Sequence, residues 1–344
     1  MNVKTIWALL KETFSEWNKD KASRLAAALA YYTIFSLAPL LIIVIAIAGA
    51  VFGEEAARGE IVGQIRGLVG KDGAEVIQTA IENASQPAEG IVASVISFVV
   101  LVFGATGVFA QLQDALNTIW EVQPKPGRGI VNVIRSRFLS FTMVLGIGFL
   151  LLVSLVLSAA LAALVNFLGN LLPGLSFLWE IFNFVLGFAV TTLLFGLIFK
   201  TLPDVKITWG DVWIGAVITS LLFSIGRFLL GQYLGQSTFG STFGAAGALV
   251  IILAWVDYAA QILFFGAEFT QVYARKYGSK IVPSENAIPV TEEARAQQGM
   301  QPNDNERTQR SSGSKSRSPN SLNRLFRRFT QPKRSQRRRN NRLP

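Results

Sequence analysis

Six long apolar stretches dominate the sequence and constrain what the chain can fold into. Each is about 20 residues or longer, the helical length that crosses a hydrocarbon core of about 30 Å. The stretches lie at about 25–52, 90–119, 138–167, 178–199, 212–234 and 244–273. The period-2 alternation of a membrane β-barrel is missing. The predicted fold class is therefore all-α, a polytopic membrane helical bundle with six transmembrane helices.

Composition supports a membrane protein and excludes several kinds of chemistry. Of the 344 residues, 51% are hydrophobic and 16% are charged, whereas soluble chains carry about 25% charged residues. Histidine and cysteine are absent, so Ser-His-Asp and Cys-His catalysis, disulfides and zinc fingers are excluded. A hydrolase built from Asp and Glu alone stays possible in principle, but no motif points to one. We therefore expect no enzyme activity, no cofactor and no metal site.

Basic residues in the connections predict the orientation, because Lys and Arg accumulate in cytoplasmic loops. Five precede the first span, four follow the second and two follow the fourth. The connection after the first span has three basic against seven acidic residues, and the other two connections on that side carry no charge. Both termini of this multi-pass protein are thus predicted to be cytoplasmic.

Two segments outside the spans complete the predicted organisation, a six-span domain over 1–280 and a tail over 281–344. Residues 54–87 show helical apolar spacing that is interrupted from Gly70 to Gly73. This pattern predicts two short amphipathic helices, and an outer lid packed on the bundle is favoured over a partner-binding site. From 281 onward Ser, Gln, Asn, Pro and Arg prevail, which is typical of disorder.

The predicted tail carries the positive charge of the chain, whose formal net charge is +10. Residues 274–344 contain 17 Lys or Arg and 5 Asp or Glu, and residues 1–273 contain 15 and 17. Membrane lipids are the expected partners, and a tail tethered at the membrane favours anionic lipid headgroups. Nucleic acid, which would use the same charges, is disfavoured, and a solvated tail that only enforces topology is the alternative. The oligomeric state is not predicted.

Charged residues inside spans are costly and mark functional sites by default. Arg227 in the fifth span and Asp257 in the sixth lie at nearly the same predicted height, so an ion pair near mid-membrane is geometrically reasonable. A pathway role and purely structural helix pairing both fit this pair. Asp257, Gln261 and Glu268 share one face of the sixth span at i, i+4 and i+11, and Gln271 continues this row. This row should face the bundle interior or a water-filled cavity.

Two further patterns have a structural interpretation. A second polar stripe closes the second span at Gln111, Asp114, Thr118 and Glu121. Salt bridges from Asp114 or Glu121 to Arg135 and Arg137, fixing helix ends, are favoured over a pathway role there. Small residues at every fourth position open the sixth span, at Gly240, Gly244 and Ala248, which predicts close helix packing.

Several short motifs, in this order along the chain, resemble the YihY/BrkB family of bacterial inner-membrane proteins. They are Ala26–Tyr32, Phe35–Leu41, Ile119–Val122, Leu202–Asp204, Trp255–Tyr258 and Phe265–Glu268. The resemblance covers about Leu25 to Gly278 and implies a six-span protein of the bacterial inner membrane linked to envelope lipid homeostasis. Some family members carry labels as a tRNA-processing ribonuclease or as virulence factors. The family pattern more often has an aromatic or aliphatic residue at 257, so the resemblance does not imply the Arg227–Asp257 pair.

The function predicted from these features is transport or envelope lipid handling through a polar intramembrane pathway. The candidate residues for the pathway and its polar surroundings are Arg227, Asp257, Gln261, Glu268 and Asp114. One alternative is a non-transporting scaffold that recruits partners through its lid or basic tail. A membrane-bound ribonuclease is disfavoured, because the chain lacks His and clustered metal ligands.

Overall fold

The computed structural model describes residues 3–84, 91–125, 142, 146, 176–235, 239–279 and 281–300. These residues are mostly helical, and five of their helices contain a stretch long and apolar enough to cross a membrane. The stretches are Ala22–Ala50, Val99–Ile119, Phe184–Thr201, Trp209–Leu230 and Ala246–Tyr277. The predicted all-α membrane bundle is confirmed. Almost all of the span expected over 138–167 lies outside the described residues, so the number six stays a prediction.

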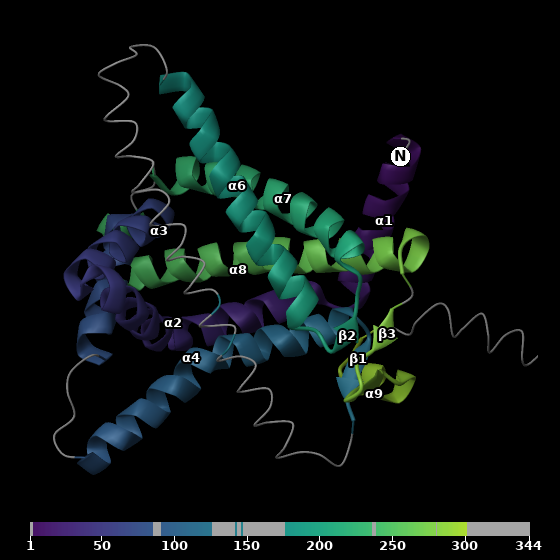
Figure 1. Cartoon of the computed structure of the whole chain (residues 1–344), viewed down its shortest axis with the longest axis horizontal. Helices are drawn as coiled ribbons and strands as arrows, with labels where there is room; N and C mark the ends of the chain where they lie inside the picture. The colour runs from purple at the N-terminus through teal and green to yellow at the C-terminus, as the bar shows by residue number, and fades with distance from the viewer. Residues whose placement is uncertain are drawn as a thin grey trace, which may run out of the picture. The chain divides into compact units, whose positions relative to one another are not determined.

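Most of the long helices coincide with the apolar stretches, and several of them pack around one helix, α8 (Figure 1). Their bounds are α1 Val3–Lys19, α2 Ala22–Phe52, α3 Glu54–Ala84, α4 Ile91–Ile119, α6 Ser176–Thr201, α7 Trp209–Gly235 and α8 Phe239–Tyr277. Helix α8 packs against α1, α2, α3, α4 and α7, while α6 packs against α7. Because five helices pack against α8, polar residues on its covered faces lie among protein side chains.

Helix α2 continues through Pro39, and α4 approaches it closely at that point. A Cβ atom added at Gly104 would lie 3.0 Å from the Cγ atom of Pro39, and one added at Gly107 would lie 3.1 Å from the Ser36 hydroxyl. Small residues allow such close approach of helices. The α2–α4 contact therefore depends on the two glycines of α4.

The segment predicted as a lid is α3, a helix pair with a break at Gly70. Gly70 has φ 81° and ψ 179°, a conformation that glycine adopts without steric cost. The buried side chains of α3 that face the bundle, Val69, Ile77 and Ile81, form one cluster with Ile45, Ile252 and Trp255. The segment thus packs on α2 and α8, as the sequence predicts.

Short strands join the helix ends at one end of the bundle. β1 (Val122–Pro124) pairs antiparallel with β4 (Ala287–Pro289), and β2 (Val205–Lys206) pairs antiparallel with β3 (Val282–Pro283). We call this the strand-bearing end, at which α4, α6 and α8 finish and α2 and α7 begin. The basic segments that the charge pattern predicts to share one side of the membrane and that fall in the described residues meet here.

This pairing corrects the predicted boundary of the tail. The sequence places disorder from 281, but residues 281–291 belong to the same compact unit as the helices. The Ser284 N–H donates to the Asp204 carbonyl at 2.8 Å, and the Val290 N–H donates to the Glu121 carbonyl at 2.9 Å. Apolar residues in this segment complete strands that composition alone does not indicate. A second unit spans 292–344 and contains α9 (Glu292–Gln297), and its residues 301–344 lie outside the described part.

Candidate functional site

Helices α7 and α8 pack closely through two glycine–threonine contacts, Gly215 with Thr270 and Gly266 with Thr219. We call these two contacts the α7–α8 lock. A Cβ atom added at Gly215 would lie 1.7 Å from the Thr270 hydroxyl, and one added at Gly266 would lie 1.8 Å from the Thr219 hydroxyl. Each threonine in turn donates a hydrogen bond of 2.7 Å within its own helix, Thr219 to the Gly215 carbonyl and Thr270 to the Gly266 carbonyl. The two helices are therefore antiparallel neighbours that touch at backbone distance.

The structure places Arg227 and Asp257 at a similar height but does not join them. On α7 it is Gly226 that faces α8, because an added Cβ there would overlap the Tyr258 hydroxyl at 1.5 Å. The next residue points about 100° away around a helix, and Arg227 is exposed. Within the described residues Arg227 forms no ion pair, so the predicted pair is wrong as a contact. Asp257 is half-buried, and its carboxylate lies 3.5 Å from the Gln261 amide nitrogen.

The polar row predicted along α8 becomes more deeply buried toward the strand-bearing end. Asp257 and Gln261 are half-buried, whereas Glu268 is 0% exposed and Gln271 is 4% exposed. Neither carboxylate oxygen of Glu268 accepts a hydrogen bond from the described residues, and the side-chain oxygens of Gln261 and Gln271 are likewise unpartnered there. Buried polar atoms without partners are rare in folded proteins. The row is therefore the strongest candidate site in this part of the chain.

Four charged groups of the described residues act on Glu268. Three are acidic and lie outside its helix: Glu16 on α1, Asp20 directly after α1 and Glu121 just after α4. The fourth is basic, Arg275 on α8 itself. Arg275 lies two turns further along α8, which is about 10 Å in a helix. Among the described residues, acidic neighbours thus outnumber basic ones around this fully buried carboxyl group.

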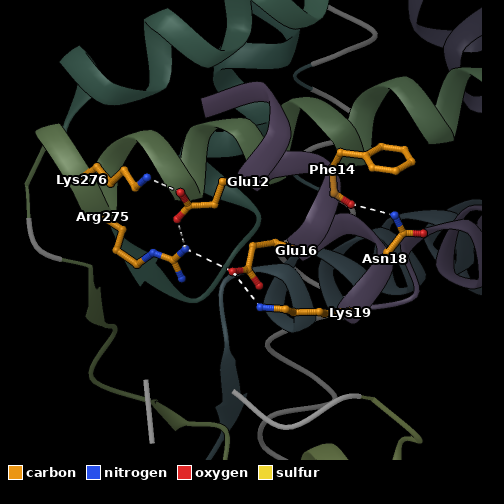
Figure 2. A network of polar contacts seen from close by, with 7 residues as sticks. All are labelled: Glu12, Phe14, Glu16, Asn18, Lys19, Arg275 and Lys276. Atoms are coloured by element: carbon orange, nitrogen blue, oxygen red, sulfur yellow. Dashed lines mark hydrogen bonds and ion pairs between the residues drawn. The ribbon is translucent and has the colours of Figure 1, made fainter. Parts of the chain in front are cut away.

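The α8 end is tied to α1 by a group of ion pairs that we call the α1–α8 clasp (Figure 2). The Arg275 guanidinium donates hydrogen bonds to Glu12 at 2.9 Å and to Glu16 at 3.3 Å. The Lys276 ammonium group pairs with the other carboxylate oxygen of Glu12, and Lys19 lies 3.6 Å from Glu16. The clasp therefore occupies Arg275 with two carboxylates other than Glu268.

Glu12 shows the electrostatic effect of the clasp. Partial burial alone would raise its pKa, but the hydrogen bonds and charges of Lys276 and Arg275 outweigh burial and hold the pKa below its usual range. A depressed carboxyl pKa means that the ionised form is stabilised in the folded state. The clasp is thus held together most firmly when Glu12 is charged.

Polar side chains also fix the connections at the strand-bearing end. The Asn117 side chain accepts a hydrogen bond from the Asp204 N–H at 2.7 Å and donates one to the Asp204 carboxylate at 3.0 Å. Asp211 accepts hydrogen bonds from the Ser279 hydroxyl at 2.7 Å and the Ser279 N–H at 3.0 Å. Of the stripe predicted on α4, Asp114 is exposed, and its proposed partners Arg135 and Arg137 lie outside the described residues.

Sequence reasoning missed the clasp, the Asn117–Asp204 bonds and the α7–α8 lock. The clasp joins residues far apart in the sequence, such as Glu12 and Arg275, which are 263 positions apart, so no local pattern indicates it. The lock does have a signal, since a glycine precedes a threonine by four residues on both helices, at Gly215 and Gly266. The small residues predicted for packing at 240 and 244 have no described side-chain environment.

The site can bind or shield polar groups, and its chemistry is that of carboxyl and amide groups. In the described residues no group of three or more Asp or Glu side chains has an arrangement that could hold a metal ion. The unpartnered oxygens of Gln261, Glu268 and Gln271 are all acceptors. They suit a proton or a donor-bearing polar group.

Comparison with known proteins gives a consistent family match. A family described as "Virulence factor BrkB" matches residues 13–289. A UPF0761 membrane protein of Teredinibacter turnerae is 27% identical over 79% of this chain and 61% of its own length. Others are 24% identical in Psychrobacter, over 81% of this chain and 51% of theirs, and 26% identical in Mannheimia succiniciproducens, over 75% and 87%. No solved structure matches the chain.

Proposed function

Because the chain belongs to the BrkB family of membrane proteins, we propose that it serves transport or envelope lipid handling in the bacterial inner membrane. The observation that carries this proposal is Glu268, a carboxyl group buried to 0% exposure inside an apolar helix with no hydrogen-bond partner among the described residues. Ionisable residues at such positions in membrane proteins mark substrate or ion pathways. A group kept only for stability would be better replaced by an apolar one.

The pathway proposed from the structure is narrower than the one predicted from the sequence. It follows Gln261, Glu268 and Gln271 along the face of α8 that becomes buried toward the strand-bearing end. Asp257 lies at its half-buried start. Arg227 is exposed on α7 and is left outside the pathway.

The orientation proposed for the protein places the strand-bearing end in the cytoplasm. This end gathers the basic residues of α1 and the start of α2, together with Lys125, Lys200 and Lys206. The segment α3 lies in the connection with seven acidic residues. Positive residues on the cytoplasmic side are the rule for inner-membrane proteins, so both termini are proposed to be cytoplasmic.

The test is complementation of a strain that lacks this protein. Glu268→Gln keeps the volume of the side chain but removes its ability to ionise, and we expect it to abolish function while the protein inserts at normal abundance. Arg227→Ala is the matched control in the neighbouring helix and is expected to complement. Full complementation by Glu268→Gln and by Gln271→Leu would refute the pathway.

A scaffold that recruits partners is the second candidate, and a hollow in α3 is the observation in its favour. Glu55, Arg58, Arg66 and Gln78 line this hollow, and the basic residues of 301–344 could hold anionic lipid headgroups. Deleting 301–344 leaves the strands of 281–291 intact. One variant deletes 301–344, and another replaces the charged residues of the hollow, Glu55, Arg58 and Arg66, with alanine. The scaffold is supported if either variant abolishes function while Glu268→Gln complements. We propose no enzyme activity for the chain.

A further inference from the structure

The state of the Glu268 carboxyl group can be inferred from what surrounds it. It is fully buried, and no described residue donates a hydrogen bond to either oxygen. Glu16, Asp20 and Glu121 act on it from neighbouring elements, and Arg275 is the basic group that acts on it from its own helix. An ionised carboxylate at this position would be a buried charge that has neither a hydrogen bond nor an ion pair with any described residue, a situation that proteins avoid by neutralisation.

Among the described residues, the basic group that acts on Glu268 is Arg275, and it is held by Glu12 and Glu16. Within this part of the chain, neutralisation therefore requires a proton or a metal cation. A cation would need several ligands around it, but among the described residues no group of three acidic side chains has that geometry. Glu16 is also occupied, since Arg275 and Lys19 both pair with it. A proton needs one oxygen atom only, and it turns an acceptor-only group into one that can also donate.

We propose that the Glu268 carboxyl group is a proton-binding site whose occupancy is coupled to the α1–α8 clasp. On uptake a hydronium ion at the strand-bearing end loses a proton, and an O–H bond forms on the carboxylate. On release this O–H bond breaks and the proton returns to water at the same end. This inference rests on the proposed function, for which it names the proton as the coupling ion.

The clasp is the element that would sense the change in charge. A negative Glu268 repels Glu16 and Asp20 and attracts Arg275, which in the described structure holds Glu12 and Glu16. Loss of the proton therefore weakens the ion pairs that hold α1 against α8. Proton uptake restores these ion pairs. Proton binding to Glu268 is therefore linked to the strength of the contact between α1 and α8.

The experiment is infrared difference spectroscopy on the full chain reconstituted in lipid bilayers without any substrate. The signal is the C=O stretching band of a protonated carboxylic acid, recorded as the pH is raised and in deuterated buffer. We expect a band in the wild type that shifts in deuterated buffer, disappears as pH rises and is absent in Glu268→Gln. Asp257→Asn, on the same helix, is the control that should keep the band.

Three results would overturn the inference. The first is the absence of any band that depends on Glu268 at every pH, which would mean a carboxylate ionised throughout. The second is a band that neither exchanges nor titrates, which would mean a structural acid. The third is a band abolished by sodium ions at constant pH, which would make the occupant a metal cation.

The coupling to α1 is measured separately, by electron paramagnetic resonance of a spin label attached at the exposed position 4 of α1 after the substitution Lys4→Cys. We expect its mobility to rise with pH over the range in which the band disappears, and to lose this dependence in Glu268→Gln. A pH-independent label beside a titrating band would refute the coupling. Because neither readout involves transport, a titrating band together with full complementation by both Glu268→Gln and Gln271→Leu would refute the proposed function and leave the proton site standing.

Discussion

The contact between α7 and α8 makes a sharp prediction about Gly266. An alanine Cβ there would lie 1.8 Å from the Thr219 hydroxyl and 2.8 Å from its Cβ, below the 3.0 Å that real Cβ contacts respect. The hydroxyl cannot simply rotate away, because the Cβ itself is too close. The helices would have to separate by on the order of 1 Å, and such overpacking costs about 1–3 kcal/mol.

The matched control is Gly187→Ala in α6, where an added Cβ meets no atom within 4 Å. Both substitutions gain the same helix propensity of about 1 kcal/mol, so this term cancels when the two variants are compared. We therefore expect Gly266→Ala to be less stable than Gly187→Ala by about 1–3 kcal/mol. The measurement is unfolding of the purified protein in mixed micelles with rising SDS, followed by the fluorescence of its seven tryptophans.

A double mutant separates the clash from other effects of the substitution. Thr219→Gly removes the three atoms nearest to the new Cβ, which all belong to the Thr219 side chain, so Gly266→Ala should no longer incur the clash in that background. The expected coupling free energy is about 1–3 kcal/mol, within the range for residues in contact. If Gly266→Ala equals the Gly187→Ala control in stability, or if the coupling is zero, α7 and α8 are not locked at this position.

Three further predictions follow from the strand-bearing end and its proposed orientation. Since the clasp lowers the pKa of Glu12, its stabilisation should be complete above the usual glutamate pKa of about 4.3 and should be lost as pH falls through the lower folded value; Glu12→Gln should remove this part of the pH dependence of unfolding, and an unchanged profile would contradict it. Asn117→Ala, which leaves the Asp204 N–H without its partner, should lower the unfolding free energy by about 1–3 kcal/mol, measured by the same SDS titration. Reporter fusions at Gly73 and Lys315 should report the periplasm and the cytoplasm respectively, and the reverse result would overturn the orientation.

The sequence predicts those features that depend on local pattern alone. Apolar length identifies the spans, and the glycine at 70 identifies the break in α3, because both effects act within a few residues. The i, i+4 and i+11 spacing of Asp257, Gln261 and Glu268 likewise identifies one face of α8. The spacing does not predict that burial increases along this face from Asp257 to Glu268. That increase depends on the tertiary packing of α1 and α4 against α8.

The wrong predictions concern properties that depend on two elements at once. Counting residues along the spans gives the height of Arg227, but its direction depends on which face of α7 meets α8, and Gly226 occupies that face. The strands at 282–283 and 287–289 are too short for a pattern of their own and form because partners lie opposite. A prediction from composition alone therefore places the start of the disordered tail too early in the sequence.

The contacts of α8 with α7 and α1 differ in kind, and this difference decides which helix can respond to a charge on Glu268. The α7 contact is steric, with backbone and hydroxyl atoms too close for any larger residue, and close-packed contacts change between discrete arrangements rather than gradually. The α1 contact includes ion pairs whose side chains are 16–38% exposed, and pairs of this kind contribute only about 1 kcal/mol or less each. A charge appearing near Glu16 acts directly on these ion pairs and is comparable to their energy, whereas the α7–α8 lock consists of glycine and threonine and contains no charged group that it could act on in the same way. The response should therefore appear in α1, with α7 and α8 moving as one body.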